Sequence, residues 1–207
     1  MTHSIIGATA WHTRPVGMER RLAAILSADV QGYSRLMHED ETATIQTLTA
    51  YRGLMASLIR QYRGRVVDDP GDNVLAEFPS VVEAVQCAVT IQRTLAARNA
   101  ELPPQRQMVF RMGLHLGDIV VEQERIYGAA INLAARLERV AEGGGLCISG
   151  TVYDHVVAKL PLETIKDVPI KVYVLPGVET YVSFLMEQSL DKNPGWLSKI
   201  RQKINLV

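Results

Sequence analysis

Cysteine is scarce in this chain of 207 residues, and so are long apolar runs and any surplus of one charge. The two cysteines, Cys87 and Cys147, stand far apart and form no CxxC pair, which argues against a zinc site and against a disulfide framework. We expect both to be reduced thiols in the core or at an interface of a cytoplasmic protein.

No apolar run approaches the roughly 18 residues of a membrane-spanning helix, and the early stretch 5–11 lacks the basic flank of a signal peptide. The 22 basic and 22 acidic residues cancel, so there is no global positive field to collect nucleic acid. A hydrophobic content of 47% with 21% charged residues is typical of a soluble globular domain. These absences predict a cytoplasmic protein that does not bind nucleic acid.

Three segments differ in pattern. Residues 1–19 show no hydrophobic period, and we expect a flexible N-terminal arm there. Residues 20–176 carry the strand and helix patterns of one folded domain. Residues 177–207 form a tail with a short amphipathic helix, whose apolar stripe runs from Trp196 to Val207. Packing on its own domain, binding of a partner and contact with a membrane surface all remain open for this helix.

The first half of the domain begins with an apolar run, 22–28, that ends abruptly at Asp29 and indicates a buried strand. Helical spacing of apolar residues predicts one long amphipathic helix over about 33–62. Two apolar runs within 66–78 flank a Pro-Gly pair, the signature of a type II turn, so this segment is predicted to be a β-hairpin. Asp72 then lies just past its tip.

The second half continues the alternation of strands and helices. We predict a helix over 81–95, a long strand, straight or bent, over 108–121, a helix over 128–142, a strand over 146–149, a helix over 151–159 and a strand over 170–175. The resulting β-α-β-β-α-β order with extra C-terminal elements predicts an α+β protein with a ferredoxin-like core.

Asp29 and Asp72 are the first candidates for chemistry. A strand-end residue and a hairpin residue on the neighbouring strand can converge, because adjacent strands are only about 4.8 Å apart. Two carboxylates there suit Mg²⁺ or Mn²⁺, which share their ligand shell with phosphates. Residues 30–34 open a helix, so their backbone amides are placed for the β and γ phosphates of a triphosphate. Each aspartate alone has an ordinary explanation, as turn chemistry or as a helix cap.

Four blocks of the chain match one family in its usual order. They are AILSADVQGYS at 24–34, PGDNVLAEF at 70–78, FRMGLHLG at 110–117 and YGAAINLAARLE at 127–138. Over about 20–174 the sequence resembles the class III adenylyl and guanylyl cyclase catalytic domain. The resemblance implies a head-to-tail homodimer whose active sites lie at the interface and are built from both subunits.

The resemblance also implies roles for residues near the carboxylates. It makes Asp29 and Asp72 the ligands of two Mg²⁺ or Mn²⁺ ions, with the Val30 carbonyl as a third ligand. Arg111 becomes a phosphate contact, and the segment that follows Asp29, which includes Gln31, Gly32 and Tyr33, is expected to hold the triphosphate. The implied reaction is attack of the ribose 3′-oxygen on the α-phosphorus, which releases pyrophosphate and a 3′,5′-cyclic monophosphate for cyclic-nucleotide signalling.

Asn132 and Arg136 match the family pair that orients the ribose and stabilises the transition state. Their i, i+4 spacing puts both on one helix face, while Leu133 and Leu137 share another. Without the other blocks, Arg136 would be explained as a surface arginine. The family also grips the phosphates with a lysine on a late loop, for which Lys166 is the candidate, although the loop is about two residues shorter here.

Asp68 and Arg125 depart from the adenylyl cyclase pattern. Those enzymes read adenine with a lysine four residues before the hairpin aspartate and, commonly, an aspartate seven residues before the helix asparagine, so both charges are reversed here. Adenine has no ring N–H for Asp68 to accept, whereas guanine and uracil both offer one, together with a carbonyl for Arg125. ATP by family membership, GTP, UTP as in pyrimidine cyclases of anti-phage systems, and a merely structural salt bridge all stay open.

Two other classes of protein share parts of this sequence pattern. A catalytically silent, cyclase-like dimerisation module would have lost metal or transition-state residues, and here Asp29, Asp72, Asn132 and Arg136 are all present. A diguanylate cyclase or polymerase palm shares the core, but the sequence has no Gly-Gly-Asp/Glu-Glu-Phe hairpin.

Overall fold

A computed structural model describes residues 18–68, 71–160, 168–173 and 182–184. Most of the predicted arm, the tail helix and Lys166 lie outside these residues, as does part of the predicted hairpin turn. None of the helices among the described residues is long and apolar enough to cross a membrane.

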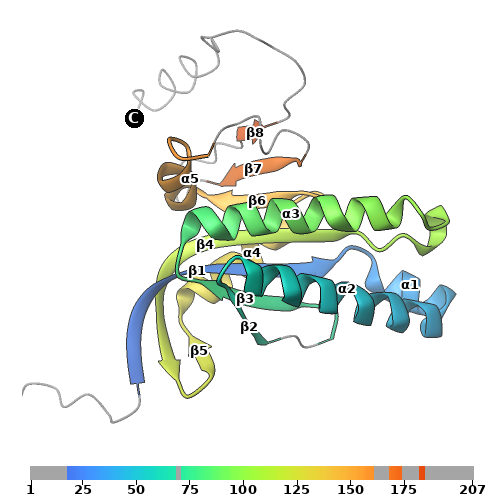
Figure 1. Ribbon diagram of the computed structural model, residues 1–207, viewed down its shortest axis with the longest axis horizontal. Coiled ribbons are helices and arrows are strands. Elements are labelled where there is room, and N and C mark those ends of the chain that lie inside the picture. Colours follow the sequence, from blue (N-terminus) through green and yellow to red (C-terminus); the bar gives the residue numbers. More distant parts are fainter. Residues whose placement is uncertain (1–17, 69–70, 161–167, 174–181, 185–207) are drawn as a thin grey trace, which may run out of the picture.

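The described residues form one eight-stranded sheet with helices on both faces (Figure 1). Its strands are β1 (Met18–Val30), β2 (Arg65–Asp68), β3 (Val74–Phe78), β4 (Phe110–Glu122), β5 (Arg125–Tyr127), β6 (Leu146–Ser149), β7 (Ile170–Tyr173) and β8 (Val182–Phe184). The helices are α1 (Tyr33–Glu39), α2 (Glu41–Gln61), α3 (Val81–Asn99), α4 (Ala129–Val140) and α5 (Gly150–Val156), with a short 3₁₀ turn at Pro104–Arg106.

The strand order is β2-β3-β1-β4-β6-β7-β8, with β5 paired to β4. The first four strands of that order are antiparallel to their neighbours, and β1 lies between β3 and β4. This is the predicted ferredoxin-like core, in which helices connect β1 to β2 and β3 to β4. Beyond it β6 runs parallel to β4 and β7 parallel to β6, so the sheet is mixed, as expected for an α+β protein.

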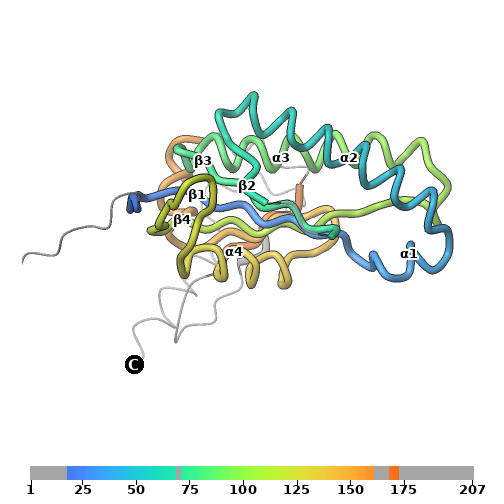
Figure 2. Tube along the Cα trace, turned by 90° about the horizontal axis from the view of Figure 1, so that it is seen from below, coloured from blue at the N-terminus to red at the C-terminus, as the bar shows by residue number. Residues whose placement is uncertain are grey.

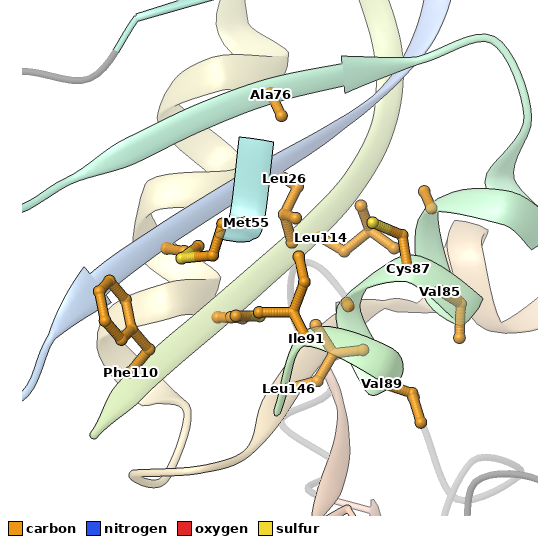
Figure 3. Close-up of a cluster of buried hydrophobic side chains, with 14 of the residues drawn as sticks. Leu26, Met55, Ala76, Val85, Cys87, Val89, Ile91, Phe110, Leu114 and Leu146 are labelled. Atoms are coloured by element: carbon orange, nitrogen blue, oxygen red, sulfur yellow. The ribbon is translucent and has the colours of Figure 1, made fainter. Parts of the chain in front are cut away.

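Helices α2 and α3 cover one face of the sheet and α4 covers the other (Figure 2). The larger core lies under α2, α3 and α5, where Leu26, Met55, Ile91 and Leu114 meet (Figure 3). A smaller cluster under α4 includes Ala23, Ile25, Ile119, Ile126, Ala130 and Ala134. Both faces of β1 are covered, which explains why the middle of this strand is a continuous apolar run in the sequence.

Helix α4 approaches the sheet closely at Gly113 of β4. A Cβ atom there would overlap the backbone of Ala134 and Glu138. The glycine therefore fixes which side of α4 faces the sheet. Both cysteines are buried and free, as predicted.

Several element boundaries differ from the prediction. The single helix over 33–62 is wrong: Asp40 has extended backbone and separates α1 from α2. The Asp40 side chain accepts a hydrogen bond of 2.9 Å from the Ala43 amide, so it caps the second helix instead of continuing the first. Strand β1 is longer than predicted and takes in Met18 and Glu19 from the presumed arm. The short strands β5 and β8 were not predicted.

Candidate active site

Asp29 and Asp72 lie side by side at the end of β1 and the start of β3. Strands β1 and β3 are antiparallel neighbours with Ala28 opposite Val74, which brings the residues just beyond this pair together. The Asp72 carboxyl group lies within reach of the Val30 amide, from which it accepts, and of Asp29, to which it donates when protonated. Burial, the hydrogen bond to Asp29 and its charge together raise the pKa of Asp72. The convergence predicted from sequence is therefore present in the fold.

Arg111 faces the same pair from β4. It is the direct register partner of Asp29 in the β1–β4 pairing, and its Nη2 lies 2.7 Å from Asp29 Oδ2. Its Nε lies 3.0 Å from Glu138 Oε1, an ion-pair distance without hydrogen-bond alignment. The hydrogen bond to Asp29 raises the pKa of Arg111, although burial acts in the opposite direction. Arg111, which the sequence resemblance predicts to bind phosphate, therefore pairs with two carboxylates in this structure.

Glu138 is the member of this cluster that the sequence did not predict. Its side chain is only 5% exposed, and its Oε2 accepts a hydrogen bond of 3.2 Å from the Ser27 hydroxyl. The Asn73 amide in turn lies 3.4 Å from Ser27 Oγ. Burial first, and then the charge of Asp29, raise the pKa of Glu138. One signal in the sequence could have indicated this burial. Glu138 follows Ala130 and Ala134 at a spacing of four residues, so it lies on the apolar side of α4.

The turn after β1 offers fewer free amides than predicted. The Val30 amide is bound by Asp72, and the Gln31 amide donates to the Val109 carbonyl at 2.9 Å. These two amides are therefore already hydrogen-bonded within the protein, one to a side chain and one to the backbone. The first bond of the helical turn runs from the Arg35 amide to the Gly32 carbonyl at 3.0 Å. The amides of residues 32–34 consequently have no acceptor within α1.

Asn132 and Arg136 are both exposed on α4, whereas Leu133 is half-buried and Leu137 is buried. The polar pair and the apolar pair therefore lie on different sides of the helix, as predicted. Arg136 is rotated by about 200° from Glu138 around the helix axis. Within its own chain, α4 brings Glu138 to the carboxylate pair and directs Arg136 away from it.

Asp68 ends β2 and Arg125 begins β5, and both are exposed. Arg65 of β2 donates from its Nη1 to the carbonyl of Glu124, in the turn just before β5, at 2.9 Å. Arg65 is anchored by Glu77, a buried residue of β3 that also binds Arg21 at 2.7 Å.

The cluster fits a hard divalent cation. Among the described residues no group of three or more His, Cys, Asp or Glu side chains is placed to hold a metal. A cation here would have Asp29 and Asp72, with the Val30 carbonyl and substrate phosphates completing its shell, which is the manner in which Mg²⁺ binds at many phosphate sites. Arg111 pairs with two carboxylates, Asp29 and Glu138, and Asp72 lies beside Asp29, so the carboxylates outnumber the one guanidinium that faces them.

Comparisons with known proteins identify the family of this chain. Residues 19–187 match the family described as the adenylate and guanylate cyclase catalytic domain. A Rhizobium meliloti (strain 1021) protein named Putative adenylate cyclase 3 is 44% identical over 147 residues, which cover 70% of this chain and 25% of that protein. The chain thus spans about a quarter of that relative's length.

Two solved structures share the fold. The crystal structure of an adenylate/guanylate cyclase/hydrolase from Silicibacter pomeroyi is 40% identical with a TM-score of 0.65, covering 69% of this chain and 84% of that one. The guanylyl cyclase Cya2 is 26% identical with a TM-score of 0.60, covering 81% of this chain and 92% of that one. The chain therefore belongs to the adenylate and guanylate cyclase catalytic domain family.

Proposed function

We propose that this protein converts a nucleoside triphosphate into a 3′,5′-cyclic monophosphate and pyrophosphate, with Mg²⁺ or Mn²⁺ as cofactor. The observation that carries the proposal is the contact of Asp29 with Asp72 at one end of the sheet, with the Arg111 guanidinium 2.7 Å from Asp29. Carboxylates for cations and a guanidinium for phosphate are the groups that this reaction needs.

The chain's own groups divide the work of the reaction. Asp29 and Asp72 hold the cations, and Arg111 binds phosphate oxygens. When bound, the cations lower the pKa of the attacking hydroxyl and neutralise phosphate charge. The ribose 3′-oxygen gives its proton to solvent water and forms a bond to the α-phosphorus, while the bond from that phosphorus to the bridging oxygen of pyrophosphate breaks and pyrophosphate leaves. Arg136 stabilises the charge that grows on the phosphoryl oxygens, and Asn132 orients the ribose.

The placement of Arg136 supports a head-to-tail homodimer. Arg136 and Asn132 are exposed and point away from the carboxylates of their own chain, since Glu138 occupies the side of α4 that faces those carboxylates. An arginine that acts on the transition state must reach the phosphates, so it would act at the site of a second copy. Each active site is then composed of Asp29 and Asp72 from one subunit and Asn132 and Arg136 from the other.

Two observations favour different bases in the substrate. ATP is favoured by the relatives named adenylate cyclases. Asp68 and Arg125 favour guanine or uracil, because a carboxylate accepts the ring N–H and a guanidinium donates to the carbonyl of these bases. Arg65 supports this second candidate, since it connects the strand that carries Asp68 to the turn residue that precedes Arg125.

The test is incubation of the purified dimer with Mn²⁺ and each of ATP, GTP, UTP and CTP, with detection of the cyclic product by mass spectrometry. The expected result is a cyclic monophosphate from at least one nucleotide. Product from GTP or UTP alone would support base reading by Asp68 and Arg125, and the variant Asp68→Lys should then lose that preference. No product from any nucleotide would overturn the proposal and favour a silent dimerisation module.

A further inference from the structure

Glu138 is a buried carboxylate to which the proposed mechanism gives no role. It projects from α4 toward the sheet, its side chain is 5% exposed, and it contacts Arg111 and Ser27. Burying a charged group is costly unless it is paired and hydrogen-bonded. A glutamate in this position therefore needs an explanation beyond packing.

Arg111 has two anchors of different kinds. Its Nη2 binds Asp29, whose side chain is 20% exposed and is a proposed cation ligand. Its Nε faces Glu138, whose carboxylate also accepts a hydrogen bond from the Ser27 hydroxyl. A cation bound to Asp29 competes with the guanidinium for the same carboxylate oxygens. The ion pair between Arg111 and Asp29 is therefore the one that is lost when a cation binds. The ion pair between Arg111 and Glu138 remains, because the Glu138 side chain is buried and a cation cannot reach it.

We propose that Glu138 is a positioning residue that keeps Arg111 at the site while the Nη2 end of its guanidinium exchanges Asp29 for a phosphate of the substrate. This inference rests on the proposed function, in which Arg111 binds phosphate. Glu138 touches no reacting atom and acts only through Arg111. One guanidinium then neutralises Asp29 before the cation arrives and binds the triphosphate afterwards.

Charge and positioning predict opposite effects for Glu138→Gln. Removal of a negative charge near an anion site strengthens anion binding by Coulomb's law alone. Loss of the anchor frees Arg111 to leave the site, which weakens anion binding. A purely structural role for Glu138 would change the melting temperature and leave anion affinity as it is.

The experiment is calorimetric titration of the 207-residue protein with inorganic tripolyphosphate in the presence of Mn²⁺, and a ligand without a base removes any contribution of base recognition. Glu138→Gln should bind tripolyphosphate about tenfold more weakly than the wild type. Glu142→Gln is the matched control, because Glu142 is an exposed carboxylate near the end of α4 that pairs with Lys171 on the surface. Its affinity should equal that of the wild type.

A double-mutant cycle isolates the path through Arg111. In an Arg111→Ala background, Glu138→Gln should no longer weaken tripolyphosphate binding, and loss of the negative charge alone predicts equal or slightly tighter binding. An equal loss in both backgrounds would overturn the proposal, and so would wild-type or tighter binding by Glu138→Gln alone. Should Glu138→Gln not fold, Ser27→Ala removes the other support of Glu138 and should weaken binding about threefold; unchanged affinity would then overturn the inference.

The proposed function and the positioning role of Glu138 can be tested separately. A wild-type protein that binds no tripolyphosphate with Mn²⁺ would overturn the proposed function and this inference together. Binding by the wild type that the Glu138 and Ser27 variants retain in full would overturn the inference alone.

Discussion

Asp29 and Arg111 face each other across adjacent strands, with the guanidinium 2.7 Å from the carboxylate. They are register partners near the end of β1 and the start of β4, so the sheet itself sets their separation. Asp29 is therefore ion-paired before any cation arrives, and cation binding must replace that pair.

Arg111→Lys should lower kcat/KM about 100-fold, because one ammonium cannot span Asp29 and Glu138 and also bind phosphate. The comparison is made by measuring initial rates at saturating Mn²⁺, with circular dichroism to show that the variant is folded. Arg60→Lys on the exposed side of α2 serves as the control and should stay within about twofold of the wild type. A fully active Arg111→Lys would contradict the phosphate role.

Mixing two inactive variants should restore activity if the sites are shared between subunits. Asp29→Asn and Arg136→Ala disable different halves of the site, so in a mixed dimer one site carries both defects and the other carries neither. Random pairing gives about one quarter of the wild-type rate. The measurement is cyclase activity after co-refolding or co-expression, and a mixture as inactive as its components would contradict the head-to-tail arrangement.

Glu77→Gln should lower the free energy of unfolding by about 2 kcal/mol, because the buried carboxylate pairs with both Arg21 and Arg65. Urea denaturation followed by circular dichroism measures this loss. Glu39→Gln removes an exposed i, i+4 pair with Arg35 and should cost less than about 0.5 kcal/mol. Equal losses in the two variants would show that the Glu77 cluster does not stabilise the sheet.

His115 should make stability fall in mild acid. The side chain is buried, its Nδ1 has no hydrogen-bond partner among the described residues, and burial lowers its pKa. Between that lowered pKa and the unfolded value of about 6.5, the unfolded chain binds more protons, so the free energy of unfolding falls as pH drops through this window.

The check for His115 is urea unfolding at about pH 7.5 and about pH 5.5 for the wild type and His115→Gln. The wild type should lose more stability over this interval than the variant, whatever their difference at neutral pH. The pKa values of Asp72 and Glu138 are raised in the folded protein, so the contribution of these two groups to stability increases as pH falls. Both groups are present in the wild type and in the variant, so their effect cancels in the comparison. Identical pH slopes would contradict a titrating His115.

The sequence was sufficient for the core topology and for the meeting of Asp29 with Asp72. Both follow from local signals, namely apolar runs that end at a polar residue and a turn that returns the chain to a neighbouring strand. The break at Asp40 was missed because the apolar period continues across it and no proline or glycine marks it. The three-residue strand β5 is too short to show a period.

Glu138 was missed for a different reason. Its partners Ser27 and Arg111 lie on other strands, and a glutamate on an amphipathic helix reads as exposed until the rotation of that helix is known. Contact of α4 with Gly113 sets the rotation, and this is a tertiary contact without a local signature. The same rotation decides that Arg136 faces outward, which the i, i+4 spacing alone did not reveal.

Mn²⁺ affinity, measured by electron paramagnetic resonance in the presence of tripolyphosphate, tests the central claim most directly. Asp29→Asn and Asp72→Asn should each weaken Mn²⁺ binding at least about tenfold and abolish product formation. Asp154→Asn, an exposed aspartate on α5 across the sheet from α4, should bind as the wild type does. Wild-type Mn²⁺ affinity in both Asp29→Asn and Asp72→Asn would contradict the assignment of the carboxylate pair as the metal site.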